Sequence, residues 1–306
     1  MPFILDGIGN TPLVELRRIA PPGAARIVAK LESANPTGSM KDRMARAAIA
    51  AAAADGRLPP GGTAVEYTAG TTGISLALAC TAMGFGLKII TSDAFAAEKL
   101  AMMRALGAEV VALPSEAGRI DAALVRRMIA TAQEIADAPG HWLVDQLSNH
   151  DATAGYHALG EEILAQAGPV QALVQSVGTG HALQGAARAM RRQVPDLHVC
   201  AVEPAESAVL SGGPSGAHRI EGIGVGFIPP LWQPEEADEI IAVSSAEAME
   251  MARRLAREEA IFAGTSSGAN VVAALRIAER LGAGATVATV ICDSGLRYLS
   301  TGLWPG

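Results

Sequence analysis

The sequence predicts an α/β fold of two domains, each a largely parallel, twisted sheet covered by helices. Short β-branched runs alternate with alanine-rich helical stretches along almost the whole chain, and this alternation is typical of parallel sheets packed between helices. The chain has 306 residues, which is more than one small domain needs to form a core. Apolar residues make up 50% of it and charged residues only 18%, so we expect a globular protein rather than a disordered one.

The alternation predicts a series of strands and helices along the chain. The expected strands are residues 26–32, 63–67, 87–92, 109–113, 172–176, 198–202, 239–243 and 286–292. The expected helices are residues 41–54, 72–83, 96–106, 120–136, 153–167, 182–192, 246–258 and 267–281. Ser244 is followed three residues later by Glu247, which is the capping-box pattern that opens a helix.

The alternation breaks near residues 141–153, and we place the domain junction there. We expect an N-terminal domain of residues 1–147 and a larger C-terminal domain of residues 148–306. A second irregular stretch, residues 203–236, is rich in Gly, Ser and Pro. A loop of that length inside a compact domain usually has a function.

Composition argues against several classes of function. The net charge is −7 and the isoelectric point is about 5.4, so nothing favours nucleic acid or an anionic membrane as a partner. No apolar stretch approaches the roughly 20 residues that span a bilayer, and no signal peptide is visible. Cys80, Cys200 and Cys292 have no paired spacing. We therefore expect free, buried thiols in a cytoplasmic protein, with neither a disulfide nor a metal site.

Lys41 is one of only four lysines in the chain. It lies in the segment Asn-Pro-Thr-Gly-Ser-Met-Lys-Asp-Arg, residues 35–43, where a turn enters an alanine-rich helix. The helix macrodipole disfavours a cation in the first turn, so the field there favours a neutral amine. Schiff-base chemistry requires a neutral amine. Taken alone, the pattern also fits an exposed lysine on a solvated turn.

Two glycine-rich turns each follow an expected strand and open an expected helix. The first is Thr-Ala-Gly-Thr-Thr-Gly at residues 68–73, and the second is Gly-Thr-Gly at residues 178–180. Glycine there lets backbone N–H groups point at an anion on the helix N-terminus. The first turn suits a substrate carboxylate and the second a phosphate, although tight turns also use glycine for steric reasons alone. Residues 222–226 suit close approach to a flat ligand, and residues 264–268 suit a helix N-cap.

Taken together, these segments resemble the cysteine synthase family, the O-acetylserine sulfhydrylase branch of fold-type II pyridoxal-phosphate enzymes. The shared motifs occur in the same order, and the likeness runs from residues 7–13 to Thr301. They are Asn-Pro-x-Gly-Ser-x-Lys-Asp-Arg at 35–43, Thr-x-Gly-x-Thr-Gly at 68–73, Gly-Thr-Gly at 178–180, Gly-Ile-Gly-x-Gly-Phe at 222–227, Gly-x-Ser-Ser-Gly at 264–268 and Asp-Ser-Gly-x-Arg-Tyr-Leu-Ser-Thr at 293–301.

The resemblance implies a role for each site residue. Lys41 would carry pyridoxal 5′-phosphate as a Schiff base and, once displaced, take the Cα proton of the substrate. Ser266 would hydrogen-bond the pyridine nitrogen, and Thr71 would lie against the cofactor. The cofactor phosphate would be cradled by Gly178, Thr179, Gly180, His181 and Ala182. The substrate would be held by Thr68, Ala69, Gly70, Thr72, Gln146 and Gly224. No metal is implied.

A hydroxyl at position 266 has a chemical consequence. A carboxylate opposite the pyridine nitrogen would keep it protonated and make the ring a strong electron sink, whereas a hydroxyl leaves it largely neutral. Loss of a β-leaving group is then favoured over transamination. The resemblance implies β-replacement on an activated serine such as O-acetylserine, through an α-aminoacrylate, to give cysteine or a related amino acid. A β-eliminating lyase (an ammonia-lyase, dehydratase or desulfhydrase) that gives a keto acid stays open as the alternative.

The chain departs from the family pattern at the site itself. The family's turn usually reads Thr-Ser-Gly-Asn-Thr-Gly, but Ala69 replaces the serine and Thr71 replaces the asparagine. In the phosphate loop, His181 and Ala182 replace a glycine and a threonine, and Tyr67 stands where proline is common. We therefore expect a divergent paralogue that acts on an amino acid with a β-leaving group, which need not be O-acetylserine.

An oxidoreductase and a protein without catalytic activity are two further classes of function. A dinucleotide-dependent oxidoreductase needs Gly-x-Gly-x-x-Gly after its first strand, but residues 26–32 run into Asn-Pro-Thr-Gly-Ser. A catalytically silent homologue that only binds a partner is a further alternative, because the substrate turn is altered.

The resemblance also implies an assembly and a motion. We expect a homodimer in which a small mobile part, about residues 40–147, closes over the substrate while the first roughly 35 residues pack with the other domain. Some relatives bind serine acetyltransferase, and the altered substrate turn argues against carrying that partner over.

Overall fold

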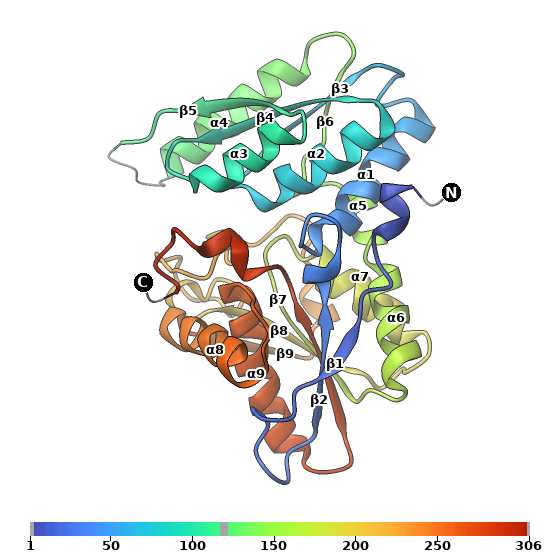
Figure 1. Ribbon diagram of the computed structural model, residues 1–306, viewed down its shortest axis with the longest axis vertical. Coiled ribbons are helices and arrows are strands. Elements are labelled where there is room, and N and C mark those ends of the chain that lie inside the picture. The colour runs from blue at the N-terminus through green and yellow to red at the C-terminus, as the bar shows by residue number, and fades with distance from the viewer. Residues whose placement is uncertain (1–2, 117–121, 305–306) are drawn as a thin grey trace. The chain divides into compact units, whose positions relative to one another are not determined.

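A computed structural model describes residues 3–116 and 122–304 of the protein (Figure 1). The chain divides into two compact units. Unit 1 comprises the segment up to Ile8 together with Lys41–Gly155, and unit 2 comprises Gly9–Met40 and the chain from Tyr156 onward. The segment Gly9–Met40 therefore groups with the second half of the chain although it precedes most of unit 1 in sequence.

Unit 2 is built on a six-stranded sheet in the order β1-β2-β10-β7-β8-β9. Its strands are β1 (Leu13–Glu15), β2 (Arg26–Leu31), β7 (Ala172–Ser176), β8 (His198–Pro204), β9 (Glu239–Val243) and β10 (Thr286–Ile291). β1 pairs antiparallel with β2, and the other pairs are parallel. Every residue of β7 and β10 is buried, as expected for strands with helices on both faces.

Helices cover both faces of this sheet. They are α6 (His157–Ala167), α7 (His181–Arg191), α8 (Ser245–Glu258) and α9 (Thr265–Leu281). Helices α6 and α7 lie on one face, and α8 and α9 lie on the other (Figure 1). The expected capping box before α8 is confirmed, because Ser244 Oγ accepts the Glu247 N–H at 3.3 Å and the Glu247 carboxylate accepts the Ser244 N–H at 2.9 Å.

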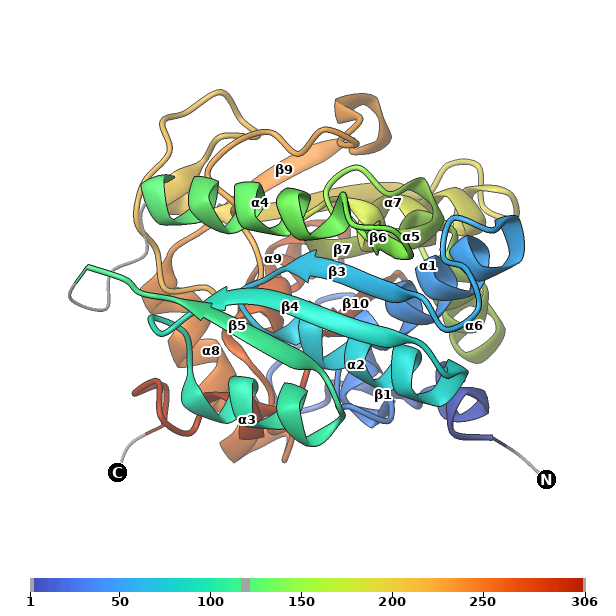
Figure 2. The ribbon, with the colours of Figure 1, turned by 90° about the horizontal axis from the view of Figure 1, so that it is seen from above.

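Unit 1 has a four-stranded parallel sheet in the order β5-β4-β3-β6. Its strands are β3 (Thr63–Tyr67), β4 (Gly86–Ser92), β5 (Glu109–Leu113) and β6 (His141–Leu143). Its helices are α1 (Lys41–Asp55), α2 (Thr71–Met83), α3 (Ala97–Ala105), α4 (Ala122–Ala136) and α5 (His150–Ala154). Figure 2 shows α4 on one face of the sheet and α2 and α3 on the other.

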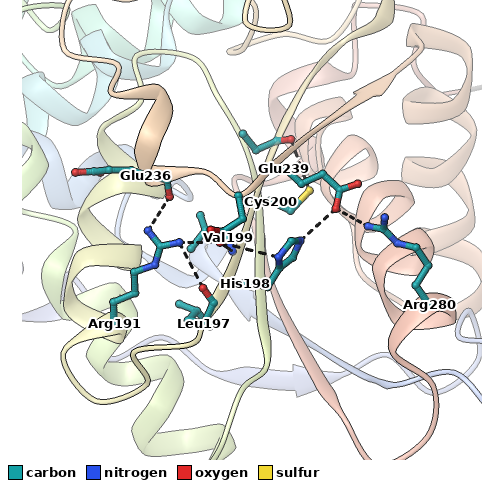
Figure 3. Close-up of polar contacts among 10 residues, drawn as sticks. Arg191, Leu197, His198, Val199, Cys200, Glu236, Glu239 and Arg280 are labelled. Carbon is teal, nitrogen blue, oxygen red and sulfur yellow. Dashed lines mark hydrogen bonds and ion pairs between the residues drawn. The ribbon is translucent and has the colours of Figure 1, made fainter.

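An ion-pair network ties α7 and α9 to the edge of the sheet in unit 2 (Figure 3). Glu239 accepts from Arg280 Nη2 at 2.6 Å and lies 3.1 Å from His198 Nε2. Arg191 Nη2 pairs with Asp238 at 2.7 Å. The hydrogen bond from the Arg280 guanidinium is the largest cause that lowers the pKa of Glu239. Because these side chains are partly exposed, each ion pair contributes little to the stability of the fold.

The fold class expected from the sequence is confirmed, and the differences concern short elements. Strands β1 and β6 were not expected, and the expected helix 153–167 is divided into α5 and α6. The division lies where the chain passes closest to α1. A Cβ at Gly155 would lie 2.7 Å from the carbonyl oxygen of Arg43 and 2.8 Å from Ala47 Cβ. The start of the expected helix 120–136 lies outside the described residues.

The cysteines of the chain carry no bridge. Cys80, Cys200 and Cys292 are buried and form no disulfide, and burial raises the pKa of Cys80 and of Cys200 to about 12. These two thiols therefore stay protonated at neutral pH.

Among the described residues no helix combines the length and apolarity needed to cross a membrane, and no group of three or more His, Cys, Asp or Glu is placed to hold a metal ion.

The capping box gives a test of the fold. Ser244→Ala removes the side chain that accepts the Glu247 N–H, so we expect the free energy of unfolding to fall by about 1 kcal/mol. Ser244→Thr keeps a capping hydroxyl and serves as the control, with a smaller loss. Urea unfolding of the two variants measures the difference, and equal stability of Ser244→Ala and the wild type would contradict it.

Candidate active site

The substrate turn of unit 1 joins the end of β3 to the start of α2. Gly70 caps the helix at φ +146°, a conformation that side chains rarely allow. A Cβ there would also lie 2.6 Å from Cδ of Lys99. The Gly70 N–H donates to Thr68 Oγ1 at 3.1 Å, which holds the turn tight. The first N–H groups of α2 have no partner within the helix and are available to an anion.

Gln146 joins this turn from the segment that follows β6. The Thr72 hydroxyl donates to Gln146 Oε1 at 2.8 Å, and Gln146 Nε2 donates to the Tyr67 carbonyl at 3.3 Å. Gln146 follows Asp145, which has φ +48°. The residues expected to hold a substrate carboxylate are therefore gathered at the carboxyl end of β3, and their role as ligands stays a prediction.

The two altered positions of the turn lie beside these donors. Ala69 is exposed and has no polar side-chain atom, while Thr71 is half-buried at the first position of α2. Neither residue takes part in the hydrogen bond between Thr72 and Gln146. The departures therefore change the side chains at the turn and leave its backbone donors in place.

Lys41 is the residue at which the chain passes from unit 2 into unit 1. It is half-buried and is the first residue of α1. The preceding residue, Met40, donates its N–H to the Cys292 carbonyl at 2.9 Å. The Ser294 N–H donates to the Gly38 carbonyl at 2.9 Å. The segment before Lys41 is thus anchored to the end of β10, which fixes the backbone position of the amine.

The phosphate turn of unit 2 joins β7 to the eleven-residue helix α7. Gly180 caps the helix at φ +90°. A Cβ on Gly178 would collide with the carbonyl oxygen of Gly222. The Gly224 N–H donates to the Val177 carbonyl at 3.1 Å. The segment around Gly222 and Gly224 therefore lies directly against the turn and leaves no room for a side chain at position 178.

The residues on either side of this turn also suit a phosphate. The Ser176 hydroxyl is buried and, within the described part of the chain, has no hydrogen-bond partner. Thr179, His181 and Ala182 are buried at 7%, 2% and 7% exposure. An unpartnered hydroxyl beside a helix N-terminus and a turn that only glycine fits form a cradle for an anion.

Ser266 lies between two residues whose hydroxyl oxygens each accept a backbone hydrogen bond. Thr265 Oγ1 accepts the Glu221 N–H at 3.1 Å, and Ser267 Oγ accepts the Cys292 N–H at 2.9 Å. Ser266 is 5% exposed in the first turn of α9, and its hydroxyl makes no hydrogen bond to the residues that the structure describes. It is therefore the hydroxyl of this turn that is available to a ligand.

These features fit pyridoxal 5′-phosphate. The cradle at Gly178 and Gly180 matches the phosphate group, and the free Ser266 hydroxyl matches a ring nitrogen. Among side chains, only that of lysine carries a primary amine that forms a Schiff base with an aldehyde, and Lys41 supplies this amine. The assignment of these individual contacts stays a prediction.

Glu66 is a polar residue of this region that sequence reasoning missed. It lies in β3 directly before the substrate turn and is 0% exposed. Burial raises the pKa of Glu66 to about 8, and Asp145 adds to the rise, whereas the N–H groups of Gln146 and Tyr67 and the charge of Lys41 oppose it. The available signal was an acidic residue inside the apolar run that leads into the turn.

Parallel sheets whose glycine turns present helix N-termini define an α/β enzyme that binds small anionic molecules. Comparison with known proteins gives the family. A family model described as pyridoxal-phosphate dependent enzyme matches residues 4–293. A cysteine synthase of Staphylococcus aureus is 41% identical over 302 residues, which is 97% of this chain and 95% of the relative. The chain belongs to the pyridoxal-phosphate dependent enzymes, and pyridoxal phosphate is its cofactor.

Solved structures agree with this result. A cysteine synthase of Entamoeba histolytica superposes with a TM-score of 0.91 at 36% identity, over 98% of this chain and 90% of that one. A hydrogen sulfide-producing enzyme of Fusobacterium nucleatum has a TM-score of 0.91 at 32% identity and covers 98% of both chains. The resemblance to cysteine synthase that the sequence motifs indicate is confirmed.

Substitutions of Ser266 and Ser267 test which of these two neighbouring serines binds a ligand and which one stabilises the fold. Ser267→Ala leaves the buried Cys292 N–H without an acceptor, so we expect the apo-protein to lose about 1–3 kcal/mol of unfolding free energy. Ser266→Ala breaks no protein contact and should change that quantity by less than about 0.5 kcal/mol, while it weakens cofactor binding. Urea unfolding of the apo-protein and cofactor titration measure the two effects. Equal destabilisation by both substitutions would contradict the assignment of Ser266.

Proposed function

We propose that this protein catalyses β-replacement on an activated serine such as O-acetylserine, giving cysteine or a related amino acid. The observation that carries the proposal is the turn at Thr68–Gly70, closed by the Thr72–Gln146 hydrogen bond of 2.8 Å, in a member of the pyridoxal-phosphate dependent enzymes. The likeness to the S. aureus cysteine synthase supports the same reaction. A substrate with an α-carboxylate and a β-leaving group satisfies both.

Lys41 is proposed to hold the cofactor and to act as the base of the reaction. The cofactor, when bound, withdraws the electron pair that the Cα–H bond releases. The substrate amine first displaces Lys41 from the cofactor, and the freed Lys41 Nζ would then take the Cα proton while the leaving group departs from Cβ with its bonding electrons. A nucleophile such as sulfide then forms the new bond to Cβ, and the proton returns from Lys41 to Cα. The anchoring of Met40 to Cys292 at 2.9 Å keeps the lysine backbone in place throughout.

The remaining site residues are proposed to bind and orient. Helix α7 and the glycines at 178 and 180 hold the phosphate through backbone N–H groups, together with Thr179, His181 and Ala182. Ser266 accepts or donates one hydrogen bond at the ring nitrogen and supplies no charge there, which favours loss of a β-leaving group. In unit 2, Gly224 lies beside the phosphate turn through its bond to Val177, where it would contact the substrate.

The altered turn bears on the substrate. Asparagine reaches further than threonine, so Thr71 makes a shorter-range contact than the family's usual residue at this position. Ala69 offers no hydroxyl. We propose that the protein is a divergent paralogue whose activated amino acid compensates for these lost donors.

We also propose a cytoplasmic homodimer in which residues from about 40 to 147 close over the substrate to exclude water. Three buried cysteines that form no disulfide are consistent with a reducing compartment. Serine acetyltransferase is less favoured as a partner because the turn at Ala69 and Thr71 is altered. No nucleic acid or membrane partner is proposed for a chain with a net charge of −7.

β-Elimination to a keto acid is the second candidate. The hydrogen sulfide-producing enzyme of F. nucleatum is similar over 98% of this chain, so the two outcomes occur on closely similar folds. In β-replacement a thiol reacts with the species that remains after the leaving group departs, whereas in β-elimination water reacts with it.

The substitution Lys41→Ala tests whether Lys41 holds the cofactor and acts as the base. The wild-type holoenzyme should absorb at about 410–420 nm as a protonated Schiff base and convert O-acetylserine and sulfide into cysteine. Lys41→Ala should lose this band and the turnover, whereas Lys88→Ala, in the interior strand β4 where the lysine pairs with Glu109 at 3.4 Å, should keep both. Thiol amino acid and pyruvate, measured with and without sulfide, distinguish replacement from elimination. Unchanged colour and turnover in Lys41→Ala would contradict the proposal.

Thr71→Asn restores the family's side chain at the first position of α2. We expect kcat/KM for O-acetylserine to rise by about tenfold, because one hydrogen bond to a buried group contributes about 1–3 kcal/mol. Thr81→Asn, at the exposed end of the same helix, is the matched control and should leave the kinetics unchanged. A fall in kcat/KM would mean that Thr71 serves a different substrate.

A further inference from the structure

Glu66 is a buried carboxyl without a charged partner. It is 0% exposed, and within the described residues it forms no ion pair. Its two oxygens are used by two backbone groups, since Oε1 accepts the Tyr67 N–H at 3.0 Å and Oε2 accepts the Gln146 N–H at 3.1 Å. An ionised carboxylate is costly in such surroundings, because two neutral donors do not replace a cation or water.

These two bonds hold both sides of the proposed carboxylate site. Gln146 is fixed through its main chain by Glu66 and through its side chain by Thr72 and the Tyr67 carbonyl, at 2.8 and 3.3 Å. Tyr67 is fixed by the same carboxyl and leads directly into Thr68. Glu66 thus connects the end of β3 to the segment after β6, and these are the two segments that carry the donors.

We propose that Glu66 is a positioning residue whose protonation state controls how well the turn at Thr68–Thr72 binds a substrate carboxylate. The proposal rests on the proposed function, which places the substrate's α-carboxylate on this turn. A neutral Glu66 orients Gln146 and adds no charge behind the site. An ionised Glu66 places a buried negative charge next to a bound anion, and the two repel each other through a region of low dielectric constant.

The sign of the pH dependence follows from this. Burial raises the pKa of Glu66 to about 8, so the group is mainly neutral at pH 7 and ionises as the pH rises above 8. Affinity for a carboxylate therefore falls over that range, and binding of the anion draws a proton onto Glu66. The charged groups that act on Glu66 are Asp145, which raises its pKa, and Lys41, which lowers it. Tyr67 has a pKa raised by its own burial and by Glu66, so it stays protonated in this range.

The test uses propionate, which has a carboxylate but no amine that titrates between pH 7 and 9. Calorimetry on the holoenzyme gives its dissociation constant at several pH values, and the same titration in buffers of different ionisation enthalpy gives the protons taken up. For the wild type we expect affinity to fall on the order of tenfold from pH 7 to 9, with net proton uptake near pH 8.5.

Two variants isolate the carboxyl. Glu66→Gln cannot ionise, so its affinity for propionate should be independent of pH and its binding should take up no proton, whatever its absolute affinity. Glu109→Gln, on the exposed edge strand β5 with 62% of its side chain accessible, should behave as the wild type. If Glu66→Gln does not fold, Glu66→Asp and the proton uptake of the wild type decide, since both should retain a pH dependence.

The outcomes separate this inference from the proposed function. Affinity that is independent of pH in the wild type, or a pH dependence that persists in Glu66→Gln, overturns the role of Glu66 and leaves β-replacement standing. No propionate binding at any pH, in a holoenzyme that carries its cofactor, overturns the carboxylate site itself and this inference with it.

Discussion

The constraint on which this structure depends is the same in both units: a strand must turn into a helix within a few residues so that the helix N-terminus faces a ligand. Gly70 and Gly180 make that turn at φ +146° and +90°, where a side chain would be strained. At Gly70 a neighbour leaves no space either, since Cδ of Lys99 lies 2.6 Å from a Cβ placed there. The backbone N–H groups at the start of α2 and α7 are thereby left available to the anions that we propose bind there.

How far the sequence predicts the fold can be seen from individual strands. The bounds of β3 and β7 were predicted to the residue, because each is a short run with a buried middle that is followed within a few residues by a glycine turn. Strands β1 and β6 have three residues each, too few for a periodic signal, and they exist only because a neighbouring strand offers hydrogen bonds. The break between α5 and α6 falls at Gly155, where a side chain would collide with the Arg43 carbonyl, and such a tertiary contact is not visible in the local sequence.

The site residues also fall into two groups, those that the local sequence reveals and those that only the fold reveals. Turns and caps are local, so the residues from 68 to 72 and from 178 to 182 are recognisable in the sequence. Glu66 is different, because its importance comes from complete burial and from a hydrogen bond to Gln146, which lies 80 positions further along the chain. Similarly, the sequence shows three consecutive hydroxyls at 265–267, and only the fold shows that Thr265 and Ser267 are engaged while Ser266 is not.

The same division is the basis for our proposal that the altered positions change the substrate specificity and leave the cofactor unchanged. In the proposed site the donors for a phosphate come largely from the backbone at Gly178 and Gly180, and a side-chain substitution such as His181 does not remove them. We propose that the substrate is discriminated instead by side-chain atoms at Ala69 and Thr71, where the loss of one buried hydrogen bond would cost about 1–3 kcal/mol, or roughly five- to a hundredfold in affinity. A fold that fixes the common chemistry with backbone groups can therefore diverge in substrate by a few side chains at the rim of the same turn.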